Sequence, residues 1–123
     1  MIEKLLRFSI VALLSIASVP TIASARTPYD GDWTVLIVTQ RGNCDPSYRY
    51  GVQIINGYLL YQGGAVNMSG RVAANGSVRV VVSSGNGHAN GSGRLSRSTG
   101  RGNWVGRSGA DACSGYWQAE RRG

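Results

Sequence analysis

Histidine occurs once in the 123 residues of this chain, at His88, and aspartate and glutamate together occur six times. A hydrolase triad needs a base beside its nucleophile, and His88 follows a glycine-rich turn on the expected outer face of a strand. No second histidine or nearby cysteine completes a zinc site around it. The scarcity of these side chains predicts a protein that is not an enzyme and that holds no metal or cofactor.

The few carboxylates also fit poorly with the paired acids of a glycosidase. Most of them stand at expected turns or strand starts, where aspartate commonly bonds the backbone: Asp30, Asp32, Asp45 and Asp111. The glycine-rich segment Gly85-Asn86-Gly87 lacks the strand-loop-helix setting of a phosphate-binding loop.

Helical periodicity is absent after residue 25, and the longest apolar run lies before it, at residues 8–19. Lys4 and Arg7 precede this run, and Ala23-Ser24-Ala25 follows it. That order is typical of a secretory signal peptide cleaved after Ala25, and the run is too short to span a bilayer. A buried N-terminal helix is the alternative. We therefore expect residues 1–25 to direct export, and residues 26–123 to form a single domain that is periplasmic or secreted.

Cysteine occurs twice, at Cys44 and Cys113, both within the part expected to be exported. In an oxidising compartment we expect them to form a disulfide, although two free buried thiols remain an alternative. Closing so long a loop stabilises a fold by roughly 4 kcal/mol on the chain-entropy model.

The expected mature chain shows short alternating runs rich in Val, Tyr and Thr, separated by turn signals such as Asn56-Gly57 and Asn75-Gly76. Eight strands are predicted, at 32–40, 48–55, 58–62, 66–74, 77–83, 88–96, 101–107 and 112–120. Strands of this length with tight turns favour an all-β antiparallel meander that closes into a barrel, and a two-sheet sandwich is the alternative.

Successive side chains of a strand point to opposite faces of the sheet, so the alternation of apolar and polar residues also predicts which side chains face inward. Apolar or small residues alternate with polar ones in three segments. They are Val66, Met68 and Val72 in the first, Val78, Val80 and Val82 in the second, and Ala89, Gly91, Gly93 and Leu95 in the third. Each tryptophan follows a glycine by two residues, so the glycine leaves room on the same face for the indole. We expect Trp33, Trp104 and Trp117 in the core, with a ligand-stacking wall as the alternative. The pattern leaves open whether the barrel is hollow or filled.

Gly31-Asp32-Trp33 on the first strand and Arg121 at the end of the last resemble the calycin pattern of lipocalins and avidins. That resemblance implies a barrel in which Arg121 packs on Trp33, and it implies a small-ligand carrier. A cation–π contact of this kind is worth on the order of 1 kcal/mol.

The whole exported part more closely resembles small exported proteins of Gram-negative bacteria that lack an assigned function. The matching segments are Tyr29-Asp30-Gly31-Asp32-Trp33 and Cys113-Ser114-Gly115-Tyr116-Trp117-Gln118-Ala119-Glu120-Arg121. This resemblance implies no particular chemistry.

Basic residues outnumber acidic ones, with eleven arginines against five acids after residue 25. Six arginines alternate to the expected outer face: Arg49, Arg71, Arg79, Arg94, Arg101 and Arg107. Such a surface binds acidic polysaccharide or lipopolysaccharide phosphate in a salt-dependent way, or it simply keeps the domain hydrated. Nucleic acid is not an expected partner, because no aromatic platform lies between the arginines.

Tyrosines form a second candidate surface, a rim for a protein or an apolar ligand, at Tyr48, Tyr50, Tyr58 and Tyr61. Inhibition of a secreted protease through this rim is a related hypothesis, whereas the alternation of Tyr48 and Tyr50 with Val52 and Ile54 favours a core position for half of it. Taken together, the residues predict a monomeric, exported binding or envelope-interaction module.

Overall fold

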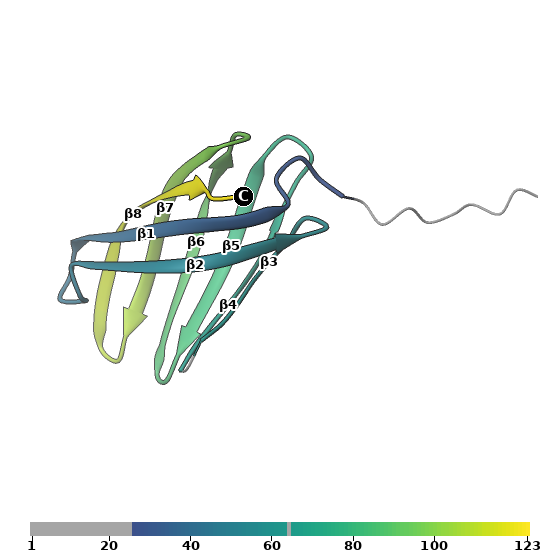
Figure 1. The fold of residues 1–123 in the computed structure, drawn as a ribbon. Helices are drawn as coiled ribbons and strands as arrows, with labels where there is room; N and C mark the ends of the chain where they lie inside the picture. The colour runs from purple at the N-terminus through teal and green to yellow at the C-terminus, as the bar shows by residue number, and fades with distance from the viewer. Residues whose placement is uncertain (1–25, 64) are drawn as a thin grey trace, which may run out of the picture.

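The computed structural model describes residues 26–63 and 65–123, and its eight strands form one closed antiparallel barrel (Figure 1). The strands are β1 (Gly31–Arg41), β2 (Ser47–Ile55), β3 (Tyr58–Gly63), β4 (Val66–Val72), β5 (Ser77–Ser84), β6 (Gly87–Leu95), β7 (Thr99–Ser108) and β8 (Asp111–Arg121). The barrel prediction is confirmed over the sandwich, and each predicted strand end lies within two residues of the observed one. The signal-peptide prediction falls outside the described residues.

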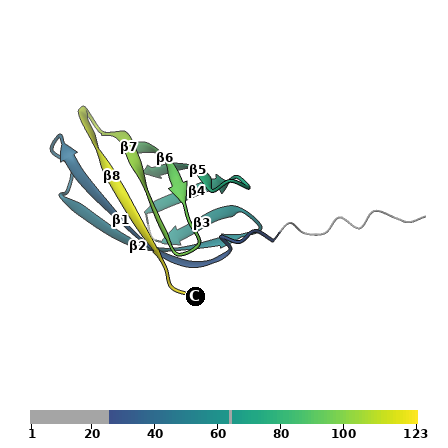
Figure 2. The ribbon, with the colours of Figure 1, turned by 90° about the horizontal axis from the view of Figure 1, so that it is seen from above.

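The ring closes because the first and last strands pair. Trp33 lies opposite Arg121 and Ile37 opposite Trp117, and the register shifts at the end of β1 where Gln40 is left without a partner. Every other strand pairs with its neighbours in sequence, so all eight ladders lie between Gly31 and Arg121. Viewed from above, the strands enclose a single interior (Figure 2). Residues 26–63 and 65–123 contain no helix long and apolar enough to cross a membrane.

Both Asn-Gly pairs lie in turns between strands, but the two turns differ in type. Asn56 and Gly57 have φ values of 52° and 82°, as a type I′ turn requires. At Asn75-Gly76 only Gly76 has a positive φ, of 91°. There Ala73 and Ser77 close a three-residue loop, and the Asn75 side chain accepts a hydrogen bond from the Ser77 amide at 2.9 Å. Gly76 therefore occupies the left-handed backbone position that follows a type I turn in a three-residue loop.

The interior positions follow the predicted alternation, and the most buried ones gather at one end of the barrel. Trp33 is 1% exposed, and Ile54 and Val78 are each 2% exposed. This is the end where β1 and β5 begin and where β2 and β8 finish. We call it the closed end, and the opposite end the open end.

Arg121 ties the closed end together. Its guanidinium donates hydrogen bonds to the backbone oxygens of Pro28 at 2.6 Å and Arg97 at 2.9 Å, and also to that of Asp30. Its Cζ lies 5.6 Å from the centre of the Trp33 ring, so the expected contact between these two side chains is present. The Trp33 indole itself donates to the Tyr29 oxygen at 2.9 Å. One arginine therefore joins the N-terminal segment, the β6–β7 turn and the core.

The two later tryptophans pack against each other's glycines. On β7 and β8, Gly102 lies opposite Trp117, and Trp104 lies opposite Gly115. Each indole crosses the strand that carries the glycine: Trp117 Nε1 donates to the Ser92 oxygen on β6 at 3.2 Å, and Trp104 Nε1 to the Val38 oxygen on β1 at 3.0 Å. On β7 and β8 the Gly-x-Trp spacing thus leaves room for the indole of the partner strand, whereas the sequence predicts room for the indole of the same strand.

The disulfide prediction is also confirmed. Cys44, in the β1–β2 connection, is bonded to Cys113 of β8 with the two Cα atoms 6.2 Å apart. The bond joins the first loop of the barrel to its last strand, beside the seam where the ring closes.

Replacing Gly102 should therefore be costly, because a Cβ at this position would overlap the Ser92 backbone oxygen and would lie 2.6 Å from Cε2 and Nε1 of Trp117. We expect Gly102→Ala to lower the free energy of unfolding by about 2–3 kcal/mol, the usual cost of overpacking a core. Gly91→Ala is the matched control, since its Cβ would meet only ordinary contacts at 3.7 Å or more and should be neutral or slightly stabilising. Urea unfolding followed by tryptophan fluorescence measures both, and equal effects would contradict the proposed packing.

Arg121→Ala should destabilise the barrel by about 2 kcal/mol, because it leaves three backbone oxygens without their charged donor. Arg121→Lys keeps a cation near Trp33 but loses the two-nitrogen fork, so it should retain part of the stability. Thermal unfolding of the two variants beside the parent checks the order. A lysine variant no better than alanine would show that the charge over Trp33 adds nothing.

Candidate ligand-binding site

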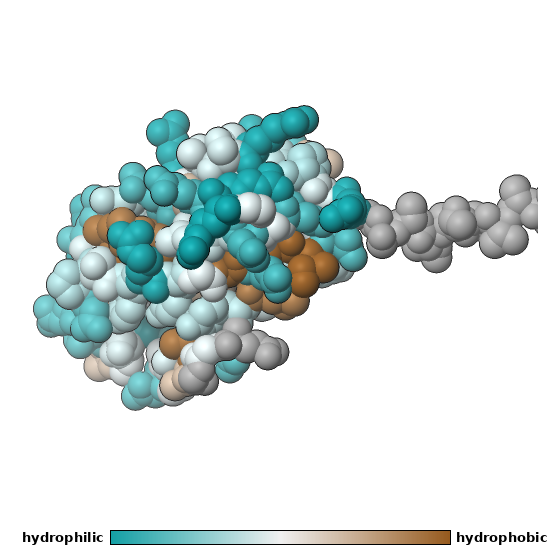
Figure 3. Space-filling model, viewed as in Figure 1, coloured by the Kyte–Doolittle hydropathy of each residue, from teal (hydrophilic) through white to brown (hydrophobic). Residues whose placement is uncertain are grey.

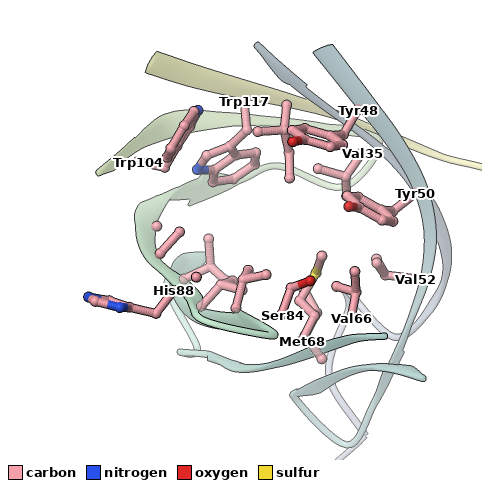
Figure 4. Close-up of a pocket in the computed structure, with 18 of the residues that line it drawn as sticks. Val35, Tyr48, Tyr50, Val52, Val66, Met68, Ser84, His88, Trp104 and Trp117 are labelled. Carbon is pink, nitrogen blue, oxygen red and sulfur yellow. The ribbon is translucent and has the colours of Figure 1, made fainter. Parts of the chain in front are cut away.

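The barrel encloses a cavity of about 230 Å³ (Figure 4). Its walls are mainly aliphatic and aromatic, with Val35 and Ile37 from β1, Val52 from β2, Met68 from β4, and Val80 and Val82 from β5. Small residues of β6, Ala89 and Gly91, line the opposite side. Among the described residues no polar or charged side chain is buried, so the walls offer few hydrogen-bonding groups that could hold a water molecule.

The cavity lies between the packed closed end and the turns of the open end. Trp33, Ile54 and Val78 form its floor at the closed end, and the turn residues Ser84 and Ser108 border it at the open end. Both serines are exposed. The cavity walls are therefore mainly apolar, with the Tyr48 and Tyr50 rings among them and the two serines near solvent.

All three tryptophans border this cavity, and their burial differs. Trp33 and Trp117 are buried, as expected for the core. Trp104 is only half-buried, so its predicted place in the core is wrong. It stands closer to the open end, with its indole nitrogen bonded to the β1 backbone and the rest of the ring beside the cavity (Figure 4). Trp33 and Trp117 therefore belong to the core, and Trp104 borders the cavity outside it.

The barrel wall is incomplete between β2 and β3. These strands pair at only three positions, all near the closed end, from Gln53–Leu60 to Ile55–Tyr58. Towards the open end, β2 pairs only with β1, and β3 pairs only with β4. The Tyr50 and Tyr61 rings meet edge to face across this divergence, with centroids 5.1 Å apart. Tyr48 lies beside Tyr50, with ring centroids 6.1 Å apart. Aromatic rings thus take the place of backbone pairing here.

The environment of Tyr50 affects its ionisation. Burial raises the pKa of the Tyr50 hydroxyl above its ordinary value of 10.0, and the nearby Tyr48, Tyr61 and Asp45 add to this. Tyr50 is therefore neutral at physiological pH and remains a hydrogen-bond donor at the cavity wall.

The predicted tyrosine surface is divided by the structure. Tyr48 and Tyr50 face the cavity and Tyr61 packs beside them, whereas Tyr58 is exposed on the outside with Arg71 stacked at 5.0 Å from its ring centre. No continuous rim of four tyrosines exists.

The six predicted surface arginines are all exposed, but they lie on different parts of the barrel. Arg71 is the Cα partner of Arg79, and Arg94 is the partner of Arg101. Arg49 lies apart on β2, and Arg107 pairs with His88 near the open end. The His88 ring points away from the cavity (Figure 4).

Among residues 26–63 and 65–123, no group of three histidine, cysteine or carboxylate side chains could hold a metal ion. Asp30, the most strongly bonded acid, has a structural role: its carboxylate accepts hydrogen bonds from the Asn56 amide at 2.8 Å, the Gly57 amide at 3.1 Å and the Thr27 hydroxyl at 2.6 Å. Partial burial alone would raise the pKa of this carboxyl, but these bonds outweigh it and lower the pKa.

Alternation identified Val78, Val80 and Val82 as inward-facing, but it could not tell whether an inward side chain meets another across the barrel or borders a cavity. Gly91 was expected on the inner face, and it borders the cavity where a larger side chain would fill it. The short β2–β3 ladder had no sequence signal.

No protein-family model matches this chain, and no curated protein or solved structure matches it. The site must therefore be interpreted from its own geometry.

The raised pKa of Tyr50 predicts a pH dependence of stability at high pH. Because the folded state disfavours the Tyr50 anion, its contribution is fully present below about pH 10 and is lost as pH rises through the higher folded value. In Tyr50→Phe, the free energy of unfolding should fall less steeply as the pH rises above about 10. The rise in tyrosinate absorbance should also lose the part that belongs to Tyr50. Tyr58→Phe is the control, because Tyr58 is exposed. Identical alkaline profiles for the two variants would contradict the assignment.

Proposed function

We propose that the barrel is a non-enzymatic carrier that binds one small apolar molecule in its interior. The observation that carries this proposal is the cavity of about 230 Å³ with apolar walls and no buried polar group among the described residues. Apolar cavities of roughly 150 Å³ stay dry and accept benzene, so a larger one favours a larger apolar guest.

The walls also define the shape of the ligand. Charged side chains that border the cavity occur only at its open end, where Arg107 is exposed and alternates outward. An uncharged body therefore fits the interior, and a polar group of the ligand would face the Tyr50 hydroxyl on the wall, or Ser84, Ser108 or solvent at the open end. Indole and phenol rings on either side suit a flat or chain-like guest.

This function is compatible with export. The Cys44–Cys113 disulfide fits an oxidising compartment, and the N-terminal basic, apolar and small-residue order supports a cleavable signal. We place the carrier in the periplasm or outside the cell. The calycin resemblance points to the same role, because Arg121 contacts Trp33 between the last and first strands.

Titration with a series of 1-alkanols from hexanol to dodecanol tests the proposal on residues 26–123 with the disulfide formed, since all eight strands lie within this span. Binding should quench or shift tryptophan fluorescence and raise the unfolding temperature. Each added methylene should tighten binding about fourfold, equivalent to about 0.8 kcal/mol, until the cavity is full.

Filling the cavity from within provides the decisive variant. Gly91 borders the cavity and a Cβ there meets nothing closer than 3.7 Å, so Gly91→Leu should fold and abolish alkanol binding. Gly51→Leu is the matched control, because Gly51 is exposed and a Cβ there meets nothing within 4 Å. It should bind like the parent. Saturable binding that survives in Gly91→Leu would place the ligand elsewhere, and no binding by the parent would refute the carrier.

A further inference from the structure

One edge of β2 lacks a neighbouring strand over most of its length. The ladder between β2 and β3 ends at the pair of Gln53 and Leu60, so among the described residues the stretch 47–52 of β2 pairs with β1 alone. In Figure 1, β2 runs across the view while β4 and the strands after it run downwards, and β2 and β3 separate away from the closed end. We call residues 47–52 the free edge of β2.

The register shows which backbone groups lie on the free edge. The amide and the carbonyl oxygen of Asp32 bond residues 123 and 122, beyond β8. Asp32 and its Cα partner Gln53 therefore form a pair whose backbone groups point away from each other. Since these groups alternate in direction along a strand, those of Gly51 and Arg49 also point away from β1. The amide and carbonyl groups of both residues thus lie along the free edge.

This edge is accessible from outside the barrel. Arg49 and Gly51 are exposed, and a Cβ at Gly51 would meet nothing within 4 Å. The alternate side chains, Tyr48 and Tyr50, face inward and border the cavity, with ring centroids 6.1 Å apart. Apolar surface among polar side chains is visible over β2 and β3 (Figure 3). A strand added here would have its outer face beside Arg49 and its inner face over two tyrosine rings.

We propose that the free edge binds an extended segment of another protein, which adds a strand to β2. An antiparallel segment would exchange hydrogen bonds with the backbone groups of Arg49 and Gly51. Its residue opposite Arg49 would face outward, and its residues opposite Tyr48 and Tyr50 would face inward. The charge of Arg49 favours an acidic residue at the first position, and the tyrosine rings favour apolar residues at the other two.

Arg49 also disfavours a second copy of this chain as the added strand. In every antiparallel register that bonds Arg49 to the free edge of a copy, the two Arg49 side chains lie opposite each other or within two residues of it. Their like charges would repel, whereas an acidic residue would pair. Strand addition goes beyond the carrier function and does not depend on it, because its hydrogen bonds are made at the edge of β2.

A peptide titration followed by amide NMR spectra tests strand addition on residues 26–123 with the disulfide formed. The probe is acetyl-Thr-Val-Glu-Val-Thr-amide, whose glutamate and valines match the outward and inward positions. We expect saturable binding in which the amides of Arg49 and Gly51 shift most and become protected from hydrogen exchange. Methylation of the glutamate amide nitrogen, which would face β2, should weaken binding about tenfold. Methylation of the second valine amide nitrogen, which would face away, is the matched control and should change binding little.

Three variants of the protein separate the contributions. Gly51→Pro removes an edge amide but leaves the β1 ladder intact, so it should fold and lose peptide binding, whereas the control Gly51→Ala should retain it. Arg49→Glu should shift the preference towards the same peptide with lysine at its centre, by up to about fivefold. Gly91→Leu, which fills the cavity, should still bind the peptide. Thermal unfolding shows whether each variant is folded, and the methylated peptides test the same bond without changing the protein.

Each contrary result overturns a different part. Equal weakening by the two methyl groups would overturn strand addition. An unchanged preference in Arg49→Glu would overturn the acidic partner. Loss of peptide binding in Gly91→Leu would make the peptide a guest of the cavity instead, and dimers of the parent that disappear in Gly51→Pro would assign the edge to a second copy. Absence of any shift at Arg49 and Gly51 would refute this binding site, and it would leave the alkanol result unaffected.

Discussion

The barrel depends on the absence of side chains opposite its indoles. Gly102 faces Trp117 and Gly115 faces Trp104 on two adjacent antiparallel strands, and each indole crosses a strand to reach a backbone oxygen beyond it. Large rings can then lie flat against the inner wall instead of projecting across the interior. A barrel this small would otherwise be filled by two tryptophans, and here they leave space between the walls.

That space has two unlike sides. One side carries small residues and two indoles on β6–β8, and the other is mainly aliphatic, with tyrosines and Trp33, on β1–β5. The closed end is held by Arg121 and the N-terminal segment, and at the open end the cavity is bordered by the exposed Ser84 and Ser108. The outer surface is organised separately, because alternating residues of the same strands carry arginine and exposed aliphatic side chains. The period of two allows one sheet to present an apolar container inside and a charged surface outside.

Much of this architecture could be predicted, since it is local in sequence. Alternation identified the inward faces of β4, β5 and β6, turn residues located the strand ends, and the expected oxidising compartment predicted the pairing of Cys44 with Cys113. Features that depend on contacts between distant strands could not be predicted. The half-buried position of Trp104 follows from its height in the barrel and from the Val38 oxygen on a strand far away in sequence. The separation of Arg49 from the paired arginines follows from register, and the type of the Asn75-Gly76 turn follows from a side-chain hydrogen bond.

Two junctions between neighbouring strands, β1–β8 and β2–β3, differ greatly in strength. Beside the β1–β8 ladder, the Cys44–Cys113 bond fixes the first loop covalently to the last strand, whereas β2 and β3 share three paired positions and a contact between tyrosine rings. Fluctuations of a closed ring concentrate where the fewest hydrogen bonds must break. The barrel should therefore part between β2 and β3 while the rest of the wall stays paired. A molecule in the interior could exchange with solvent by sideways opening of this seam, at a small fraction of the free energy needed to unfold the protein.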